Sequence, residues 1–261
     1  MCAQPPLNRN DLDFFYEKNI KVINDSPDNI TNIGITGGEP TLLGEKLLHL
    51  IKKIQLRYPN ALIHLLTNGR SFADIQYTNK FLSIKNILFG IPIHSDYIRD
   101  HDIITQKKGS YTETLKGLYH LANIGAEIEL RIVINKINYQ RLPQISEFIW
   151  RNLPFVAFIS FMGLEDTGYS IKNHDKIWID PIEYQTQLET AVINLDKWGL
   201  NVSLFNLPLC LLRPSLYQFA KKSISDWKVT YIEACLSCSK KDICCGLFST
   251  SKRQSNNIKP L

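Results

Sequence analysis

The sequence alternates between short apolar runs and longer segments whose apolar residues recur at helical spacing, and this alternation is its most restrictive feature. The apolar runs predict six strands, at residues 32–36, 61–66, 86–93, 127–134, 155–161 and 202–205. The periodic segments predict helices at residues 42–58, 71–82, 112–124, 141–150 and 181–198. Strands that alternate with helices favour a parallel sheet with crossover helices. We therefore expect an α/β fold, a partial TIM-like (β/α)6 barrel that falls short of the closed eight-stranded form.

Composition limits the broad class of the protein. With 44% hydrophobic residues in a chain of 261, there is too much apolar material for general disorder. No run approaches the ~18 apolar residues of a membrane span, so we expect no membrane contact. The net charge of +5 lies in scattered lysine pairs without a long basic stripe, which argues against a nucleic-acid partner.

The first residues have neither the basic lead nor the apolar core of a signal peptide. We therefore expect a cytoplasmic protein, in which six cysteines are better suited to metal binding or catalysis than to disulfides. Five of them lie between residues 210 and 245, after the strand–helix alternation has ended. We expect a core at residues 1–207 and a cysteine-rich metal or auxiliary-cluster region at residues 208–261. The polar stretch 249–261 is expected to fray.

The segment Thr36-Gly37-Gly38-Glu39-Pro40 ends one predicted strand and opens a predicted helix. Ligands of parallel α/β sheets bind at the carboxyl ends of strands, and a pair of glycines lets the backbone approach a ligand closely. Glu39 places a carboxylate where a ligand ammonium can be held, and Pro40 suits the first position of a helix. The alternative is a plain strand-to-helix turn with a capping acid.

This motif resembles the end of the second strand in the radical S-adenosylmethionine (SAM) enzymes, which reads Gly-Gly-Glu-Pro. Residues 66–69 are similar to the end of the third strand in that family. Residues 101–103 and 108–111 resemble the loop after the fourth strand, and residues 131–135 the fifth strand, of the peptide-modifying branch. The similar segments occur in the family's order over roughly the first 165 residues. The family's first strand has no counterpart, so the expected barrel lacks it.

The resemblance implies a reaction and its partners. In that family a reduced 4Fe-4S cluster cleaves SAM to a 5′-deoxyadenosyl radical, which abstracts hydrogen from the substrate. The start of the chain, residues 2–6, and its cysteine-rich tail are similar to the His-Xaa-Ser system maturases of the HxsC type. A maturase of that type is expected to modify a small precursor peptide with His-Xaa-Ser repeats. It is also expected to take electrons from a donor such as flavodoxin or ferredoxin.

The chain departs from the family at the cluster loop. The family holds its cluster with three cysteines spaced C-x3-C-x2-C, and if Cys2 is the last of them, the other two positions precede Met1. We therefore expect this chain alone to be inactive, and its start to be truncated or misassigned. Two cysteines at the expected positions in the upstream reading frame would support that hypothesis.

The resemblance also implies a set of SAM-binding residues: Gly37, Gly38, Glu39, Pro40, His94, Ser95 and Arg131. The glycine turn is expected to hold the ammonium group, Arg131 the carboxylate, and His94 and Ser95 the ribose. Asn135 is a weaker candidate for the same pocket. Structural alternatives stay open, since Arg131 can form an ion pair with Glu129 or Glu127. His94 and Ser95 can act as strand-terminal caps.

Four cysteines of the tail have metal-ligand spacing: Cys235-x2-Cys238-x5-Cys244, with Cys210 upstream. A CxxC turn directs two sulfurs at one metal, and four thiolates suit either a structural zinc or a 4Fe-4S cluster. The spacing leaves both open, and the resemblance favours an auxiliary cluster. Adjacent side chains diverge, so we expect only one of Cys244 and Cys245 to bind a given metal, and we prefer Cys244 on spacing alone.

A second function also fits the sequence: a non-catalytic degenerate barrel whose zinc-stabilised tail binds a peptide or protein partner. A conventional hydrolase is disfavoured, because no paired acid and base or nucleophile stands out. The residues around His101, including Asp96, Asp100 and Asp102, are expected to form a solvated loop.

Overall fold

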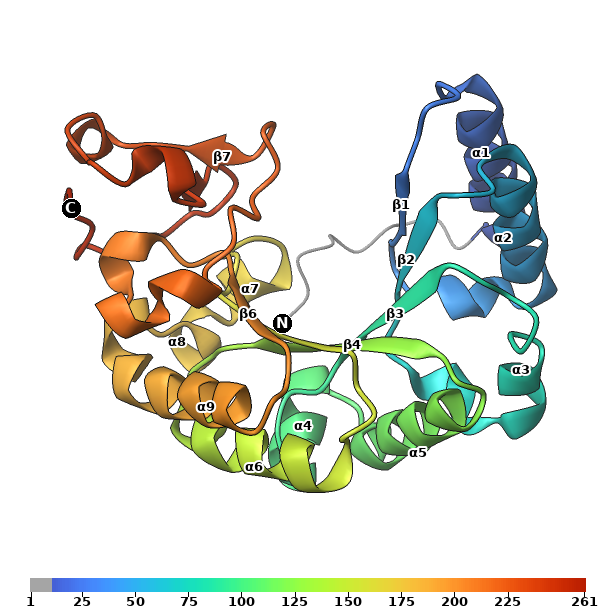
Figure 1. Ribbon diagram of the computed structural model, residues 1–261, viewed down its shortest axis with the longest axis horizontal. Coiled ribbons are helices and arrows are strands. Elements are labelled where there is room, and N and C mark those ends of the chain that lie inside the picture. The colour runs from blue at the N-terminus through green and yellow to red at the C-terminus, as the bar shows by residue number, and fades with distance from the viewer. Residues whose placement is uncertain (1–10) are drawn as a thin grey trace. The chain divides into compact units, whose positions relative to one another are not determined.

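The computed structural model describes residues 11–261, so the predicted cluster ligand Cys2 lies outside the described residues. The chain divides into two compact units. The N-terminal unit comprises residues 11–92 and 112–129, and the C-terminal unit comprises residues 93–111 and 130–261. Each unit contributes strands and helices of the α/β fold, which are labelled in Figure 1.

All six predicted strands are present and form one parallel sheet in the order β1-β2-β3-β4-β5-β6. They are β1 (Asn32–Ile35), β2 (Leu62–Leu66), β3 (Ile87–Pro92), β4 (Glu127–Val133), β5 (Phe158–Met162) and β6 (Val202–Phe205). Each strand pairs with the next one along the chain, as strands joined by crossover helices do. The expected α/β fold with six parallel strands is thus confirmed.

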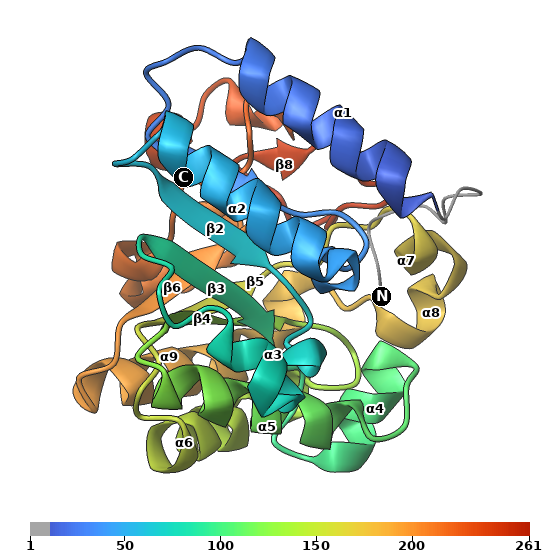
Figure 2. The same ribbon diagram turned by 90° about the vertical axis from the view of Figure 1, so that its right-hand side faces the viewer.

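The N-terminal unit covers its strands with α1 (Leu12–Asp25), α2 (Glu45–Arg57), α3 (Ile75–Asn79) and most of α5 (Ser110–Asn123). Helices α1 and α2 lie side by side (Figure 2). Along β2, Ile63 and Leu65 are fully buried whereas His64 and Leu66 are half-buried. One face of the strand therefore packs into the core, and the other keeps partly accessible polar and apolar side chains.

The expected helix over 71–82 is wrong in its extent. A 3₁₀ turn (Arg70–Ala73) is followed by the five-residue helix α3, and the break falls at Asp74. The Asp74 side chain accepts a hydrogen bond from the backbone N–H of Gln76, so it caps a new helix instead of continuing the first turn. A similar 3₁₀ turn (Pro40–Leu43) precedes α2.

The C-terminal unit contains α4 (Ile98–Thr105), α6 (Leu142–Asn152), α7 (Tyr169–Lys172), α8 (His174–Ile177) and α9 (Gln185–Lys197). Helices α6 and α9 pack against each other (Figure 1), with Ile145, Ile149, Leu188 and Val192 fully buried. None of the helices in residues 11–261 combines the length and apolar character that crossing a bilayer requires.

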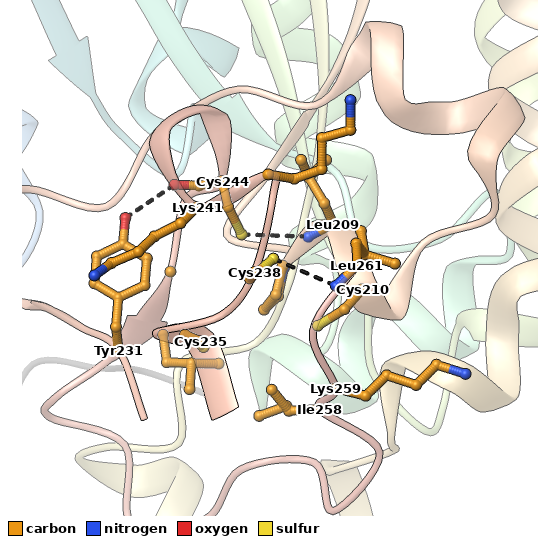
Figure 3. Close-up of a pocket in the computed structure, with 14 residues that line it drawn as sticks. Leu209, Cys210, Tyr231, Cys235, Cys238, Lys241, Cys244, Ile258, Lys259 and Leu261 are labelled. Carbon is orange, nitrogen blue, oxygen red and sulfur yellow. Dashed lines mark hydrogen bonds between the residues drawn. The ribbon is translucent and has the colours of Figure 1, made fainter. Parts of the chain in front are cut away.

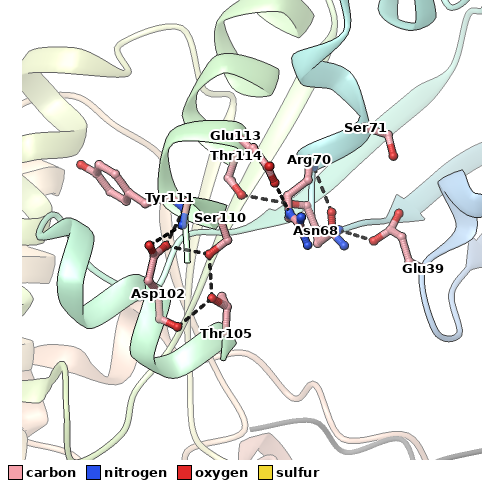
Figure 4. A network of polar contacts seen from close by, with 12 residues as sticks. Glu39, Asn68, Arg70, Ser71, Asp102, Thr105, Ser110, Tyr111, Glu113 and Thr114 are labelled. Carbon is pink, nitrogen blue, oxygen red and sulfur yellow. Dashed lines mark hydrogen bonds and ion pairs between the residues drawn. The ribbon is translucent and has the colours of Figure 1, made fainter. Parts of the chain in front are cut away.

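The expected solvated loop around His101 is wrong, because α4 covers residues 98–105 and buries His101. Asp102 accepts hydrogen bonds from the backbone N–H groups of Gly109 and Tyr111 at 2.6 and 2.9 Å (Figure 4). These bonds, with one from Ser110, outweigh desolvation and hold the pKa of Asp102 below its ordinary value. Asp102 therefore fixes the turn that leads into α5.

The cysteine-rich tail is anchored to the C-terminal unit. Ala220 forms a parallel bridge with Leu204 of β6, and a small antiparallel sheet pairs β7 (Val229–Thr230) with β8 (Leu247–Phe248). The last stretch, for which we expected fraying, contacts this unit, since Ser255 donates a hydrogen bond to Asp180. Residues on both sides of the predicted boundary at 207 lie in this one unit, and the division into two functional regions stays a prediction.

Candidate functional site

The glycine turn lies at the carboxyl end of β1 in the N-terminal unit. Gly37 has a φ of +148°, which L side chains rarely adopt, so a side chain there would strain the turn. Gly38 has no positive φ, and a Cβ added to it would meet no atom within 4 Å. Both glycines are exposed. Packing within the described chain therefore gives no reason for a glycine at 38, whereas close approach of a ligand does.

Glu39 already binds the protein with both carboxylate oxygens. Its Oε1 accepts hydrogen bonds from the backbone N–H and the hydroxyl of Thr41, at 3.1 and 2.7 Å, and from the Thr67 hydroxyl at 2.6 Å. Its Oε2 accepts one bond, from the Asn68 backbone N–H at 2.7 Å. The side chain joins the turns that follow β1 and β2, and Oε2 retains acceptor capacity for one further donor.

Helix α5 fixes the turn after β2 from the other side. Thr114 donates a hydrogen bond to the Asn68 carbonyl at 3.1 Å, and Glu113 forms an ion pair with Arg70 (Figure 4). A Cβ on Gly117 would lie 2.2 Å from the backbone oxygen of Gly69. The helix and the turn are therefore in backbone contact, and the position of Asn68 under Glu39 depends on that contact.

His94 follows β3 in the C-terminal unit and is 8% exposed. Its backbone N–H donates to Nδ1 of His101 at 3.2 Å, and its carbonyl accepts from the Asn138 amide at 2.8 Å. Its own Nδ1 is buried and has no hydrogen-bond partner within residues 11–261. A buried ring nitrogen without a partner is costly, and a ligand hydroxyl would satisfy it.

The other predicted residues of this unit already have protein contacts. Ser95 is fully buried and accepts a hydrogen bond from the Tyr97 backbone N–H at 3.1 Å, which matches the capping alternative. Arg131 is half-buried, and its Nη2 donates to Sδ of Met162 at 3.3 Å. Asn135 is fully buried, and its Oδ1 accepts from the Ile137 backbone N–H, so it shapes the turn after β4.

The paired histidines predict a pH-dependent stability. Burial lowers the pKa of His94 to about 3, helped by the charge of His101, and burial lowers the pKa of His101 to about 4. The unfolded chain takes up protons near pH 6.5, whereas the folded chain does so only near pH 4 and below. The stabilising contribution of these two histidines is therefore fully present above about pH 7. It is lost as the pH falls from there toward 4. We expect a loss of roughly 3 kcal/mol between pH 7 and pH 5 from two such groups.

Urea unfolding at a series of pH values measures this loss. His101→Asn is the comparison, because its amide oxygen can accept the His94 N–H without titrating. The variant should lose a large part of the slope between pH 7 and 5. An unfolding free energy that stays constant over this range in the natural chain would contradict the prediction.

Four cysteines line one pocket in the C-terminal unit (Figure 3). Cys210 lies in a 3₁₀ turn (Leu209–Leu211), Cys235 ends another (Glu233–Cys235), and Cys244 follows a third (Lys241–Ile243). Cys238 completes the set. Cys245 is buried, donates to the Gly246 carbonyl and is not among the residues lining the pocket. The structure thus brings together the same four thiols that their spacing had grouped.

Backbone N–H groups point at these sulfurs. Leu209 donates to Sγ of Cys244 and Leu261 to Sγ of Cys238, each at 3.5 Å. The thiol of Cys245 and then the N–H groups of Gly246 and Leu209 outweigh burial and lower the pKa of Cys244 to about 6. Burial raises the pKa of Cys210. The pocket therefore favours a thiolate at Cys244 and supplies donors that a metal-bound thiolate also uses.

The four thiols do not form a preformed site for a single ion. Within residues 11–261, no three His, Cys, Asp or Glu side chains are arranged so that they could hold one metal ion. Tetrahedral zinc needs four ligands at about 2.3 Å from one point, which this arrangement does not provide. In a 4Fe-4S cluster each thiolate binds a different iron, so the sulfurs stand farther apart.

Sequence reasoning missed most of the hydrogen-bond partners at these sites. Asn138 and His101, which hold His94, lie 44 and 7 residues from it. It also missed an Asp166–His174 contact of 3.2 Å after β5, in which Asp166 accepts a bond from Ser170 as well. The four-residue spacing of Asp166, Ser170 and His174 in the sequence is the local signal for that cluster.

Comparison with known proteins gives structural matches alone. No protein-family model matches the sequence, and no curated protein sequence matches it. A crystal structure of a domain of pyruvate-formate lyase-activating enzyme from Bacteroides vulgatus ATCC 8482 has a TM-score of 0.52 at 18% identity. The match covers 67% of this chain and 98% of that chain.

Two longer proteins match over more of this chain. Streptococcus suis SuiB bound to precursor peptide SuiA has a TM-score of 0.57 at 12% identity, with 78% of this chain and 44% of that chain covered. Native anSMEcpe with bound AdoMet and the Kp18Cys peptide has a TM-score of 0.55 at 16% identity, with 78% and 60% covered. This chain therefore spans less than two thirds of these two relatives. At such identities the similarity establishes the fold.

Proposed function

We propose that the chain is the core of a radical SAM enzyme that modifies a small peptide, of the His-Xaa-Ser maturase kind. The proposal rests on the open glycine turn at the carboxyl end of β1, which Glu39 links to the turn after β2. The fold is similar to that of a protein solved with SAM bound. SuiB has also been solved with SAM, and SuiB and anSMEcpe with peptides. These structures support a peptide substrate and SAM as cofactor for this chain.

The residues of each unit fit parts of SAM. Gly37 and Gly38 leave their backbone accessible, and Glu39 Oε2 can accept one bond from the SAM ammonium group, with Pro40 fixing the turn. In the C-terminal unit, the unpartnered Nδ1 of His94 can accept a bond from a ribose hydroxyl, and Arg131 supplies a cation for the carboxylate. Ser95 contributes by shaping the loop, because its hydroxyl is already bonded.

Two iron–sulfur groups belong to the proposal. The catalytic 4Fe-4S cluster would be held by Cys2 and two further cysteines in the C-x3-C-x2-C spacing of the family, and when bound it would supply the electron that cleaves SAM. A second 4Fe-4S cluster is proposed at Cys210, Cys235, Cys238 and Cys244, which line one pocket, and the sulfurs of Cys238 and Cys244 accept bonds from backbone N–H groups. We favour it over zinc because the thiols are not gathered round a single point. An electron donor such as flavodoxin or ferredoxin is part of the same proposal.

Anaerobic reconstitution with iron and sulfide tests this function. The chain extended upstream to include the two expected cysteines should bind about eight irons, and with dithionite it should convert SAM to 5′-deoxyadenosine. The paired variant Cys235→Ser/Cys238→Ser is the control. It should lose about four irons and still cleave SAM, because only the tail cluster is removed.

Two other outcomes have clear meanings. An extended chain that binds iron but forms no 5′-deoxyadenosine would contradict the proposed reaction. Zinc in the tail, with no iron retained anywhere, would instead support a non-catalytic barrel that binds a peptide or protein partner.

A further inference from the structure

The net positive charge of the chain lies in its tail, which corrects the expectation of an excess scattered along the sequence. Residues 221–261 contain eight Lys and Arg against three Asp and Glu, so they carry a net charge of +5, equal to that of the whole chain. The remaining 220 residues are therefore balanced, with 22 residues of each sign. A dispersed excess would serve solubility alone, whereas an excess confined to one segment creates a directional field.

Three of these lysines belong to the cysteine pocket. Lys240, Lys241 and Lys259 line it together with the four cysteines, and among the described residues neither Asp nor Glu lines it. Within residues 11–261 none of the three forms an ion pair, and the ammonium group of Lys241 lies 5.4 Å from the centroid of the Tyr231 ring. Figure 3 shows the ammonium groups of Lys241 and Lys259 pointing away from the sulfurs. Their stems cover the pocket while their charges face outward.

Exposed apolar side chains accompany this positive rim. Leu236, between two of the pocket cysteines in the sequence, is 71% exposed, and Ile243, beside Cys244, is 60% exposed. Glu233 and Asp242 are exposed in the same segment, so positive charge predominates there without excluding negative charge. Exposed apolar side chains with an excess of one charge are typical of a transient interface, in which charge steers the encounter and little area is buried. The lysine rim, defined here as Lys240, Lys241 and Lys259, therefore has the composition of a docking surface.

We propose that the lysine rim and Leu236 form the docking surface for an acidic electron-carrier protein. The inference rests on the proposed function, because it assumes a redox cluster at the four cysteines beneath the rim. Charge complementarity identifies the partner as acidic, and the cysteine pocket identifies it as an electron carrier rather than an acidic peptide. Outward-facing ammonium groups fit this role better than neutralisation of an anionic cluster, for which they would point inward.

Stopped-flow reduction by an acidic flavodoxin tests the docking surface. With the reconstituted chain, the second-order rate of cluster bleaching should fall as salt is raised from about 0.05 to 0.5 M, since screening shortens the range of the rim charges. Lys240→Glu/Lys259→Glu should lower the low-salt rate at least tenfold and lose most of the salt dependence. The matched control is Lys18→Glu/Lys21→Glu, which makes the same change in charge on exposed positions of α1 and should react like the natural chain.

The test separates failure of docking from failure of the cluster. If the tail retains no iron, the proposed cluster is wrong. Docking is then tested without the cluster, by calorimetric measurement of flavodoxin binding to the zinc-loaded protein and to the same variants. Equal rates or affinities for the natural chain and Lys240→Glu/Lys259→Glu would overturn the docking surface. Absence of flavodoxin binding would overturn it too, as would rim-dependent binding of a synthetic poly-glutamate peptide in place of flavodoxin.

Discussion

Replacing Glu39 by glutamine should destabilise the N-terminal unit by about 3 kcal/mol, because a carboxylate that accepts four protein hydrogen bonds becomes an amide with one acceptor oxygen. If the amide oxygen takes the place of Oε1, the new NH₂ group faces the Asn68 backbone N–H, and two donors then oppose each other. If the amide turns over, the NH₂ group faces the donors of Thr41 and Thr67. Neither orientation satisfies the turn.

Urea unfolding followed by circular dichroism measures the effect of Glu39→Gln. Glu45→Gln is the matched control, because Glu45 is exposed and, within residues 11–261, its one ion pair is with Lys80 at the surface. Its loss should be below about 1 kcal/mol. Under the proposed function, Glu39→Gln should also abolish measurable SAM binding at temperatures where the variant remains folded. A loss of stability no larger than that of Glu45→Gln would contradict the conclusion that Glu39 links the turn after β1 to the turn after β2.

The strands could be predicted from sequence because each one is a short run rich in apolar residues. A strand that packs against helices carries Ile, Leu, Val or Phe on its buried face, as Ile63, Leu65 and Phe89 do. Short runs of these residues are easily distinguished from the polar turns on either side. The helices were harder to bound. In the sequence, Asp74 looks like an ordinary polar residue within a helix. It acts as a helix cap because the 3₁₀ turn Arg70–Ala73 ends immediately before it. Helix α4 was missed because its eight residues include a buried histidine, which no periodicity argument counts as core.

The candidate sites show the same division between local and distant information. The grouping of Cys235 with Cys238 and Cys244 follows from spacing along ten residues, and the structure places all three beside one pocket. The donors to their sulfurs, Leu209 and Leu261, come from segments that spacing cannot relate to them. Glu39 is the clearest case. Its position in the motif suggested a ligand for an ammonium group, whereas its described partners Thr67 and Asn68 lie 28 and 29 residues away.

Gly117→Ala should cause the largest loss of stability of any single methyl group added to the N-terminal unit. The added Cβ would lie 2.2 Å from the Gly69 backbone oxygen and 3.2 Å from Cβ of Phe72, and no backbone atom can yield without moving a turn. Alanine otherwise favours a helix over glycine by about 1 kcal/mol, so the expected net loss of at least about 3 kcal/mol must come entirely from the clash. The turn that moves carries Asn68, and with it a hydrogen bond to Glu39.

Gly38→Ala provides the matched comparison, because the same methyl group enters open space at a permitted backbone angle. Its unfolding free energy should stay within about 0.5 kcal/mol of the natural value. The two substitutions should therefore separate stability from binding: Gly117→Ala lowers the urea midpoint, while Gly38→Ala keeps the midpoint and, under the proposed function, weakens SAM binding by steric exclusion. Equal midpoints for the two variants would mean that α5 can shift away from the Gly69 turn. The position of Glu39 would then not depend on the backbone contact at Gly117, and the link between the helix and the glycine turn would be lost.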